Sequence, residues 1–303
     1  FPSSAGAGPV VNILHIDEQR TWRGGEQQAS WLVRGLAARG HRVWIAGRPG
    51  APFLTAEHGG AGVERIAVPL RNELDFPSAT QLARIVRENK IDVIHAHTSH
   101  AHMIACMTRR FARRGRVVVS RRIDFAPKAN LFNRWKYRLP DAFISVSKRV
   151  DEVLAQFGVP EMKRHVVYSS IDLSRVDVEP LSREALGVPP DVPLLVSAGA
   201  LVAHKDHATL INAAEILSKQ GRDFRLLIAG DGPLRPDLQR RIVETSLRQR
   251  VLLLGHRDDV PALIRAADVY VSSSWSEGLG TSVLEALACQ KPVVATDAGG
   301  VRE

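Results

Sequence analysis

Residues 251–274, VLLLGHRDDVPALIRAADVYVSSS, contain a strand, a helix and a second strand in immediate succession. VLLLGH (251–256) and VYVSSS (269–274) are largely apolar runs, and residues 259–267 between them have the apolar spacing of a helix. Strands that are buried on both faces read as continuous apolar runs. The stretch therefore predicts two parallel strands joined by a helix, which is the repeating unit of a doubly wound α/β fold.

The same alternation continues in both directions along the chain. The second half has further predicted strands at 194–200, 225–231 and 292–297 and predicted helices at 207–220, 235–247 and 282–290. The first half has predicted strands at 10–17, 41–47, 63–70, 92–98, 116–122, 141–147 and 164–172, and helices at 26–40 and 78–90. The Pro- and charge-rich stretch 174–193 interrupts the rhythm. We predict two Rossmann-like domains, residues 1–173 and an incomplete 174–303, with ligands in a cleft at the carboxyl ends of both sheets.

The composition excludes several classes of protein. A hydrophobic content of 45% and a charged content of 24% are ordinary for a soluble globular protein, and no apolar run reaches the roughly 18 to 20 residues of a membrane-spanning helix. The first residues, FPSSAGAGPV, lack the basic start and long apolar core of a secretory signal, and the missing initial Met indicates a fragment. Cys106 and Cys289 fit no metal-site spacing, so we expect free thiols in a reducing cytoplasm.

Positive charge is concentrated in the first half of the chain. Residues 1–150 carry 24 Lys+Arg against 11 Asp+Glu, a net of +13, whereas residues 151–303 carry 17 against 21, a net of −4. Residues 101–150 alone carry 13 basic and 2 acidic residues. Such a surplus indicates an anionic partner, although a solvated face is the simpler alternative. A membrane surface or a phosphorylated substrate fits better than nucleic acid, because no nucleic-acid-binding motif accompanies the charge.

The stretch SEGLGTSVLEA (276–286) places two glutamates eight positions apart. Ser282 and Glu285 fit an S-x-x-E capping box, so Glu285 is predicted to cap a helix. Glu277 precedes two glycines that let the backbone approach a ligand, and the helix start that follows offers N–H groups to an anion. On one helix the two carboxylates would be about 12 Å apart, against roughly 5 to 9.5 Å in a glycosidase pair. The spacing favours ligand binding over paired acid/base catalysis.

Four closely spaced histidines raise the question of a metal site. His95 and His97 share one face of a predicted strand, but no acidic or Cys partner is close in sequence. His100 and His102 fall on the next predicted helix with a spacing that diverges. We therefore expect no metal ion here.

The run EGLGTSVLEALA resembles the glutamate, seven residues, glutamate motif of retaining glycosyltransferases of family 4, which have the two-domain GT-B fold. The resemblance covers nearly the whole chain in the order that the family shows. The matching stretches are WRGGEQQASWLVRGLAARGHRVWIAG (22–47), DVIHAH (92–97), FISVSKRV (143–150), VVYSSID (166–172), GALVAHKDHATLINA (199–213), LLIAGDGPLR (226–235), LLGHRDDVPALIRAADVYVSSS (253–274) and KPVVATDAGGVRE (291–303).

The resemblance implies roles for particular residues. Glu285 would bind the nucleotide ribose, Glu277 the hydroxyls of the donor sugar, and Lys205 the donor diphosphate, while His97 would lie near the reacting sugar. Further donor contacts would come from the backbone of Gly24 and Gly25, from the N–H groups of Leu279, Gly280, Thr281 and Ser282, and from Gly255 and His256 against the base. It also implies retention of configuration and no metal cofactor, because protein cations neutralise the diphosphate.

Simpler interpretations and departures from the family pattern stand beside these roles. Gly24–Gly25 alone fits a strand-to-helix turn, and Lys205 alone fits a solvated surface residue. Ala200 stands where many relatives have Arg, which removes one diphosphate cation unless Arg257 or Arg23 substitutes. Residues 169–172, SSID, stand where many relatives have NGVD.

We therefore predict a cytoplasmic retaining glycosyltransferase that moves a sugar from a nucleotide-diphosphate sugar to a lipid-linked, lipopolysaccharide or polysaccharide acceptor. A peripheral position at the inner face of the membrane would use residues 109–149, with Arg109, Arg110, Arg113, Arg114 and Arg116 against anionic lipid and NLFNRWKYRL (130–139) as an interfacial helix. The alternatives are a sugar-nucleotide epimerase of the same fold, an inactive nucleotide-sugar-binding fragment, and an oxidoreductase. The oxidoreductase lacks a G-x-G-x-x-G fingerprint after strand 10–17.

Overall fold

The computed structural model describes residues 9–55, 60 and 62–303. The chain divides into two compact units, unit 1 (Phe1–Tyr168) and unit 2 (Ser169–Glu303), so the division falls shortly before residue 174. The prediction made for the first eight residues lies outside the described part of the chain. Within the described part, no helix is both long enough and apolar enough to cross a membrane.

The described part of unit 1 forms a seven-stranded parallel sheet. Its order is β3 (Glu64–Ala67), β2 (Arg42–Gly47), β1 (Asn12–Ile16), β4 (Val93–Ala96), β5 (Arg116–Arg121), β6 (Ala142–Ser145) and β7 (Arg164–Val166). The strand order runs outward from β1 in one direction and from β4 in the other. The topological switch point, where ligands of such sheets bind, therefore lies between β1 and β4.

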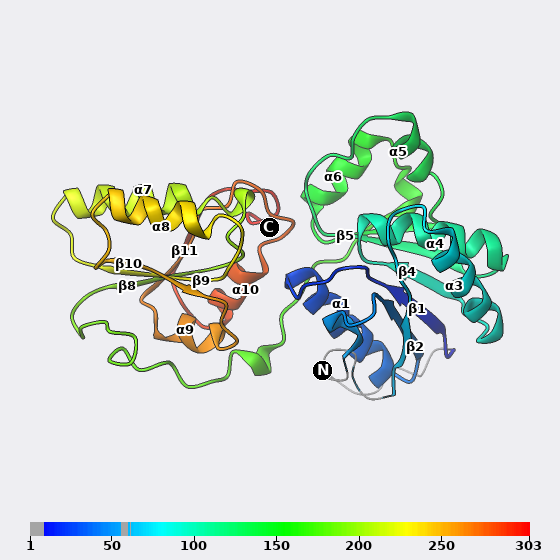
Figure 1. The fold of residues 1–303 in the computed structure, drawn as a ribbon, viewed down its shortest axis with the longest axis horizontal. Helices are drawn as coiled ribbons and strands as arrows, with labels where there is room; N and C mark the ends of the chain where they lie inside the picture. The colour runs from blue at the N-terminus through cyan, green and yellow to red at the C-terminus, as the bar shows by residue number, and fades with distance from the viewer. Residues whose placement is uncertain (1–8, 56–59, 61) are drawn as a thin grey trace. The chain divides into compact units, whose positions relative to one another are not determined.

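Helices cover both faces of this sheet (Figure 1). They are α1 (Gly24–Ala38), α3 (Phe76–Glu88), α4 (Ser99–Ala112), α5 (Leu131–Lys136) and α6 (Lys148–Phe157), with the short turns η1 (Pro52–Leu54) and η2 (Glu161–Lys163). On one face Val33 of α1 packs with Ile45 and Phe53. On the other, Leu82 of α3 and Ile104 of α4 join the larger core. Because both faces are buried, the strands read as continuous apolar runs in the sequence.

Unit 2 repeats the architecture with a five-stranded parallel sheet in its described residues. The order is β10 (Val251–Gly255), β9 (Arg225–Ala229), β8 (Leu194–Ala198), β11 (Val269–Ser272) and β12 (Val293–Ala295), which puts the switch point between β8 and β11. In Figure 1, α7 (His207–Lys219) and α8 (Arg235–Glu244) lie on one face, and α9 (Val260–Ala266) and α10 (Thr281–Ala288) on the other. The turns η3 (Leu173–Arg175) and η4 (Ala203–Lys205) complete the unit.

The predicted α/β class and all the predicted strands and helices are confirmed, with shorter bounds in several places. The strand predicted at 164–172 ends at Val166, and the one predicted at 63–70 ends at Ala67. Loops follow both strands. The Val68 N–H still donates to the Gly47 carbonyl at 2.9 Å, but Leu70 has a φ of +44°, which is incompatible with an extended strand. Helix α6 lies where no helix was predicted.

Two glycines let the loops after β8 and β9 approach each other in unit 2. Gly230 has a φ of +145°, and a Cβ there would stand 1.9 Å from the carbonyl oxygen of Gly199. The Gly230 N–H donates to the Gly255 carbonyl at 2.8 Å, which prevents the loop from moving away. No side chain fits at this position, since no real Cβ contact is that short.

We expect Gly230→Ala to destabilise the chain by roughly 3 kcal/mol or more, because backbone rather than a flexible side chain blocks the new methyl group. Gly221→Ala is the matched control. Gly221 also has a positive φ, +71°, but nothing lies within 4 Å of its Cβ position, so it should cost only about 1 kcal/mol. Urea unfolding of both variants measures the difference, and equal losses would show that the close approach does not matter.

Candidate functional site

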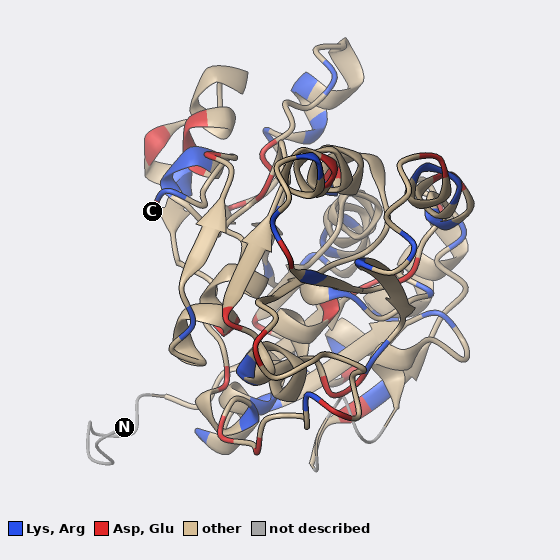
Figure 2. Cartoon of the chain, turned by 90° about the vertical axis from the view of Figure 1, so that its left-hand side faces the viewer, with Lys and Arg blue, Asp and Glu red and all other residues tan. Residues whose placement is uncertain are grey.

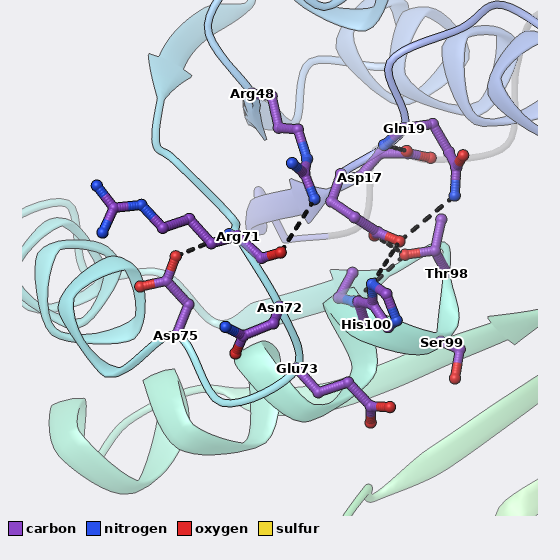
Figure 3. A network of polar contacts seen from close by, with 12 residues as sticks. Asp17, Gln19, Arg48, Arg71, Asn72, Glu73, Asp75, Thr98, Ser99 and His100 are labelled. Atoms are coloured by element: carbon purple, nitrogen blue, oxygen red, sulfur yellow. Dashed lines mark hydrogen bonds and ion pairs between the residues drawn. The ribbon is translucent and has the colours of Figure 1, made fainter.

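The carboxyl ends of β1 and β4 bring polar side chains together in unit 1. Asp17 and Glu18 follow β1, and His97 and Thr98 follow β4. The Thr98 hydroxyl donates to the Glu18 carboxylate and caps the start of α4. His100 Nδ1 lies 3.7 Å from the Glu18 carboxylate, and Figure 3 shows Thr98 and His100 beside each other at this edge. The switch point is therefore lined by groups that are tied to one another across the two strands.

The loops after β2 and β3 extend this polar edge (Figure 3). Arg48, just after β2, donates to the carbonyl of Arg71 at 3.5 Å. The Arg71 N–H donates to Asp75 at 2.8 Å, and Asp75 also accepts from Ser78 at the start of α3. Asp75 thus fixes the loop that carries Arg71 beside the switch point.

Two buried histidines and one arginine form a directional hydrogen-bond chain, and a third histidine lies beside it. Arg122 lies 3.2 Å from Nδ1 of His97, and Nε2 of His97 lies 2.8 Å from Nδ1 of His15. A guanidinium can only donate, so His97 Nδ1 accepts from Arg122 and His97 Nε2 donates to His15. His15 Nε2 then carries a hydrogen that finds no acceptor among the described residues. His95 is held separately by Ser120 at 2.8 Å.

These imidazoles are neutral at physiological pH. Burial, with the nearby Arg122 cation acting in the same direction, lowers the pKa of His15 to about 3. Burial also holds the pKa values of His95 and His97 well below the usual range, with neighbouring histidines and Arg122 acting in the same direction. The histidines therefore add no positive charge of their own beside the Arg122 guanidinium.

The same histidines are compact enough to raise the metal question again. Among the described residues, His15, His95 and His97 have ligand atoms that all lie within 4.8 Å of one another. The sequence had not placed His15 in this group, and His100 and His102 lie outside it. The Nδ1 lone pairs of His97 and His15 already accept hydrogen bonds, and a divalent cation would stand beside the Arg122 charge. Hydrogen-bond direction and charge therefore argue for a positioning role rather than a metal site.

Arg122 also faces two buried carboxyl groups. Asp17 is 1% exposed, and burial raises its pKa to about 7, with the charge of Glu26 adding to the shift. Burial raises the pKa of Glu26 as well, and Glu26 closes the first turn of α1 by accepting from the Arg23 N–H at 2.9 Å. Burial lowers the pKa of Arg122, while Asp17 and Glu26 oppose that shift. The three groups form one charge-coupled cluster.

Gly24 and Gly25 open α1 next to this cluster. A Cβ at Gly25 would stand 3.8 Å from Cδ of Arg122, an ordinary contact. The fold of unit 1 therefore does not by itself require glycine there. The predicted phosphate approach of these two residues stays a prediction.

In unit 2 the structure brings Lys205 and Glu277 together at the β8/β11 switch point. Lys205 Nζ lies 2.5 Å from the Glu277 carboxylate, and the Ser274 hydroxyl donates to the same oxygen at 2.7 Å. Both charged side chains are largely buried. Gly199 gives the lysine stem room, because a Cβ there would approach Lys205 Cε to 3.4 Å.

The loops that carry this pair are fastened to each other. Ser273 donates to the carbonyls of Lys205 and Asp206 at 3.0 and 2.8 Å. The Tyr270 hydroxyl donates to the Ala198 carbonyl at 3.1 Å and accepts from its N–H at 3.3 Å. Burial raises the pKa of Tyr270 to about 12, so the phenol stays protonated. The carboxyl ends of β8 and β11 therefore form one rigid frame.

The predicted capping role of Glu285 is wrong. Helix α10 starts at Thr281, and its N-cap is Gly280 at a φ of +83° with no side-chain cap, so Glu285 lies too far along the helix to close it. The left-handed Gly280 sets the N-cap two residues earlier than the S-x-x-E pattern, which puts it at Ser282. Glu285 is instead half-buried, 3.8 Å from Arg175. Burial raises its pKa, and Arg175 opposes that shift.

The remaining predicted donor residues lie at different points of unit 2. Leu279 and Gly280 form the loop after Glu277, and Thr281 and Ser282 form the first turn of α10. A Cβ at Gly280 would stand 3.0 Å from Val301, so glycine fits this turn. Gly255 ends the edge strand β10, and the exposed His256 that follows lies 3.3 Å from Asp258.

Of the two suggested substitutes for the missing cation at Ala200, Arg257 is already engaged by Asp259 through two bonds of 2.7 and 2.5 Å. Sequence reasoning missed Arg122, His15 and Asp17. Their signal was the presence of a charged or imidazole side chain in or directly after an apolar strand, VVVSRR and VVNILHID.

Family comparison agrees with this architecture. The model for Glycosyltransferase Family 4 matches residues 22–175, half of the chain. The chain belongs to this family. The model for Glycosyl transferases group 1 matches residues 178–303, so the two matches follow the two units closely.

Individual relatives of this family-4 chain span several named activities. A 2-deoxystreptamine glucosyltransferase of Streptomyces kanamyceticus is 31% identical over 58% of this chain and 47% of its own length. An N-acetylgalactosamine-N,N'-diacetylbacillosaminyl-diphospho-undecaprenol 4-alpha-N-acetylgalactosaminyltransferase of Campylobacter jejuni is 28% identical over 78% of this chain and 66% of its own. This chain thus spans about half the length of the first relative.

The solved structures show the fold. The crystal structure of Anabaena Alr3699/HepE in complex with UDP and glucose superposes with a TM-score of 0.80 at 21% identity, covering 96% of this chain and 82% of that one. At that identity the likeness establishes the GT-B fold and leaves the substrates open.

We expect the buried Asp17 to make unit 1 less stable as pH rises. Its folded pKa, about 7, exceeds the value of about 3.9 in an unfolded chain. The stabilisation is complete below the unfolded value and is lost as pH rises toward the folded one, by roughly 2–4 kcal/mol in all. Asp17→Asn should therefore gain stability over the original chain between about pH 4 and pH 8, as measured by urea unfolding at several pH values.

Asp75→Asn is the matched control with the opposite sign. Burial raises the pKa of Asp75, but hydrogen bonds from Arg71 and Ser78 outweigh it and leave the pKa lowered. The stability from Asp75 is therefore present at neutral pH and lost as pH falls. Parallel pH curves for Asp17→Asn and the original chain would contradict the buried-carboxyl assignment.

Proposed function

We propose that this chain belongs to a retaining glycosyltransferase that transfers a sugar from a nucleotide-diphosphate sugar to a lipid-linked, lipopolysaccharide or other glycan acceptor. The observation that carries the proposal is the Lys205–Glu277 pair at the β8/β11 switch point. It puts the predicted diphosphate cation and the predicted sugar-binding carboxylate in one place, within a family-4 chain. The relatives quoted above are named as transferases, which favours transfer over epimerisation.

Binding of the donor would break the contact between Lys205 and Glu277 and replace it with contacts to the donor. The diphosphate attracts the ammonium of Lys205, and the hydroxyls of the sugar can donate to the carboxylate of Glu277. Each partner therefore exchanges its present contact for one to the donor. Because the pair is largely buried, both charges are already desolvated and held by the fastened loops. Charge that develops on the leaving diphosphate would meet a preorganised cation.

Glu285 is assigned to the ribose. A carboxylate with two oxygens can accept from two neighbouring hydroxyls, and such charge-assisted bonds are the stronger kind. Glu285 lies about one turn into α10 and is half-buried, so fewer water molecules compete for its hydrogen bonds. Burial raises the pKa of Glu285, and the Arg175 cation opposes that rise and so favours the charged carboxylate. Backbone groups from Leu279 to Ser282 would complete the contact with sugar and diphosphate.

In unit 1 we assign the reacting sugar and acceptor to the β1/β4 edge. Both ring nitrogens of His97 are engaged, one by Arg122 and one by His15. We therefore assign the substrate contact to Arg122, and His97 acts as the positioning residue that holds the guanidinium. We infer that Arg122 meets an anionic group of a substrate at the β1/β4 edge of unit 1.

The reaction would proceed with retention. The diphosphate leaves the anomeric carbon with the bonding electron pair, and the acceptor oxygen attacks from the same face. The acceptor proton passes to the leaving diphosphate oxygen, so that charge and atoms balance. Neither Glu277 nor Glu285 acts as a nucleophile in this scheme, which agrees with their engagement in ligand binding. Acceptors linked to lipid would place the enzyme at the cytoplasmic membrane surface.

Binding of the donor tests the assignment directly. We expect uridine diphosphate or a related sugar nucleotide to raise the thermal midpoint of the chain, since a ligand that binds only the folded state stabilises it. Glu285→Gln should weaken binding by roughly 30- to 100-fold, the worth of hydrogen bonds to a charged acceptor. A panel of sugar nucleotides in a thermal-shift assay measures both.

Glu215→Gln is the control for this substitution, because Glu215 forms an i,i+4 pair with Lys219 on the surface of α7. It should keep the full thermal shift. The donor-site assignment fails if no sugar nucleotide stabilises the chain, or if Glu285→Gln shifts as much as Glu215→Gln does.

Product analysis tests the reaction class. We expect nucleoside diphosphate release to require an acceptor and the new glycosidic bond to keep the anomeric configuration of the donor, as read from proton NMR coupling. An epimerase would instead release nucleotide without any acceptor. Inverted configuration in the product would overturn the retaining assignment while leaving the donor site in place.

A further inference from the structure

The loop after β5 and helix α5 carry an unusual density of exposed apolar side chains. Within residues 123–135, five large apolar residues are exposed: Ile123 by 48%, Phe125 by 39%, Leu131 by 86%, Phe132 by 37% and Trp135 by 49%. We call these five residues the β5–α5 surface. Exposed apolar residues are common singly, but a cluster marks an interaction surface.

Helix geometry puts three of these residues on one side of α5. Leu131, Phe132 and Trp135 are spaced i, i+1 and i+4, which keeps them within about 100° around the axis. The rings of Phe132 and Trp135 contact each other with centroids 5.9 Å apart. The three exposed side chains therefore form one continuous apolar face of α5.

Buried polar contacts hold this face in place. Lys136, the last residue of α5, is 1% exposed, and its Nζ contacts Glu73 at 2.5 Å and the Ser99 carbonyl at 2.7 Å. At the other end of the segment, Arg121 donates to the Phe125 carbonyl and to the Tyr137 hydroxyl. The α5 helix is anchored from beneath, and its aromatic side remains outward.

The charges around the surface are mainly positive. Residues 123–140 contain four basic residues against one acidic residue, Asp124. Lys136 is engaged by Glu73, whereas Lys128, Arg134 and Arg138 are exposed. An aromatic face bordered by cations matches the boundary of an anionic bilayer, where the rings lie at the headgroup level and the cations reach phosphates.

The arginine group of residues 109–116 is the competing candidate. Its side chains line a cavity of about 550 Å³. Two of them are already paired, Arg109 with Asp141 and Arg114 with Asp92, both at 2.9 Å. Figure 2 shows basic and acidic residues interspersed over much of the chain in the same way.

Position along β5 separates the two surfaces. The strand begins at Arg116, within the arginine group, and ends at Arg121, just before the β5–α5 surface. The two surfaces therefore lie at opposite ends of one strand. Only the β5–α5 surface shares the carboxyl end of the sheet with His97 and Arg122.

We propose that the β5–α5 surface is the membrane-contacting element of this chain and that it takes anionic phospholipid. The inference rests on the proposed function to the extent that a lipid-linked acceptor brings the chain to a bilayer. With the aromatic face in the headgroup layer, the anchor of such an acceptor stays in lipid while its sugar reaches the β1/β4 edge. The arginine group at the amino end then serves no part of this contact.

Co-sedimentation with phosphatidylcholine vesicles, with and without phosphatidylglycerol, tests the proposal. We expect the original chain to bind the phosphatidylglycerol vesicles and the Phe132→Ser/Trp135→Ser double variant to bind them at least about tenfold more weakly, since two large apolar side chains are lost. The triple variant Arg110→Ala/Arg113→Ala/Arg116→Ala should retain most of the binding. Absence of binding by the original chain, or loss in the triple but not the double variant, overturns the proposal.

Quenching by brominated lipid gives a second readout that needs no disruptive change. Trp135 should be quenched in vesicles that contain brominated chains, and Trp135→Phe, which keeps an aromatic ring, should lose most of that quenching. Equal quenching in both proteins overturns the proposal, because another tryptophan would then be the inserted one. The sugar-nucleotide thermal shift is measured on the same variants. Its absence would count against the donor site and leave the vesicle result to judge the surface.

Discussion

The arrangement of this chain depends on one topological constraint, the reversal of strand order within each parallel sheet. At β1/β4 and at β8/β11, neighbouring strands continue into connections that leave in opposite directions. The loops at their carboxyl ends therefore cannot cover each other, and polar side chains lie there beside an apolar core. The charge clusters around Arg122 and Lys205 both occupy such points. The sites proposed for the donor and the acceptor both depend on this placement of charged side chains at the open edge of a sheet.

The two edges offset the desolvation free energy of their partly buried charges in different ways. In unit 2 a lysine and a glutamate compensate each other directly, so that a ligand must replace both contacts at once. In unit 1 a guanidinium faces two carboxyl groups whose pKa values burial raises, while three neutral histidines surround it. Raised carboxyl and lowered imidazole pKa values both reduce the number of charges that the edge must desolvate. A substrate that brings its own negative group would complete the compensation of Arg122.

The sequence was sufficient for the fold because both sheets are covered on two faces, and such strands read as apolar runs. It was also sufficient for Lys205 and Glu277 individually, but their contact joins residues 72 positions apart and no local pattern indicates it. The capping prediction failed because S-x-x-E does not report a left-handed glycine at 280. Arg122 and His15 were missed because a charged residue at the end of an apolar run reads as the end of a strand. Only the order of the strands in the sheet reveals that these two side chains lie near the switch point.

Helix α5 combines two features that are unfavourable when each is considered alone. A buried lysine needs a compensating carboxylate, and exposed aromatic side chains favour association with other molecules. Here the first feature fixes the second, because the Lys136–Glu73 contact ties α5 to the loop before α3 and its contact with Ser99 ties it to the start of α4. An apolar cluster that served only to fill space could have turned inward. Anchoring the helix by a buried charge keeps the aromatic face outward, which is what a surface that must enter lipid requires.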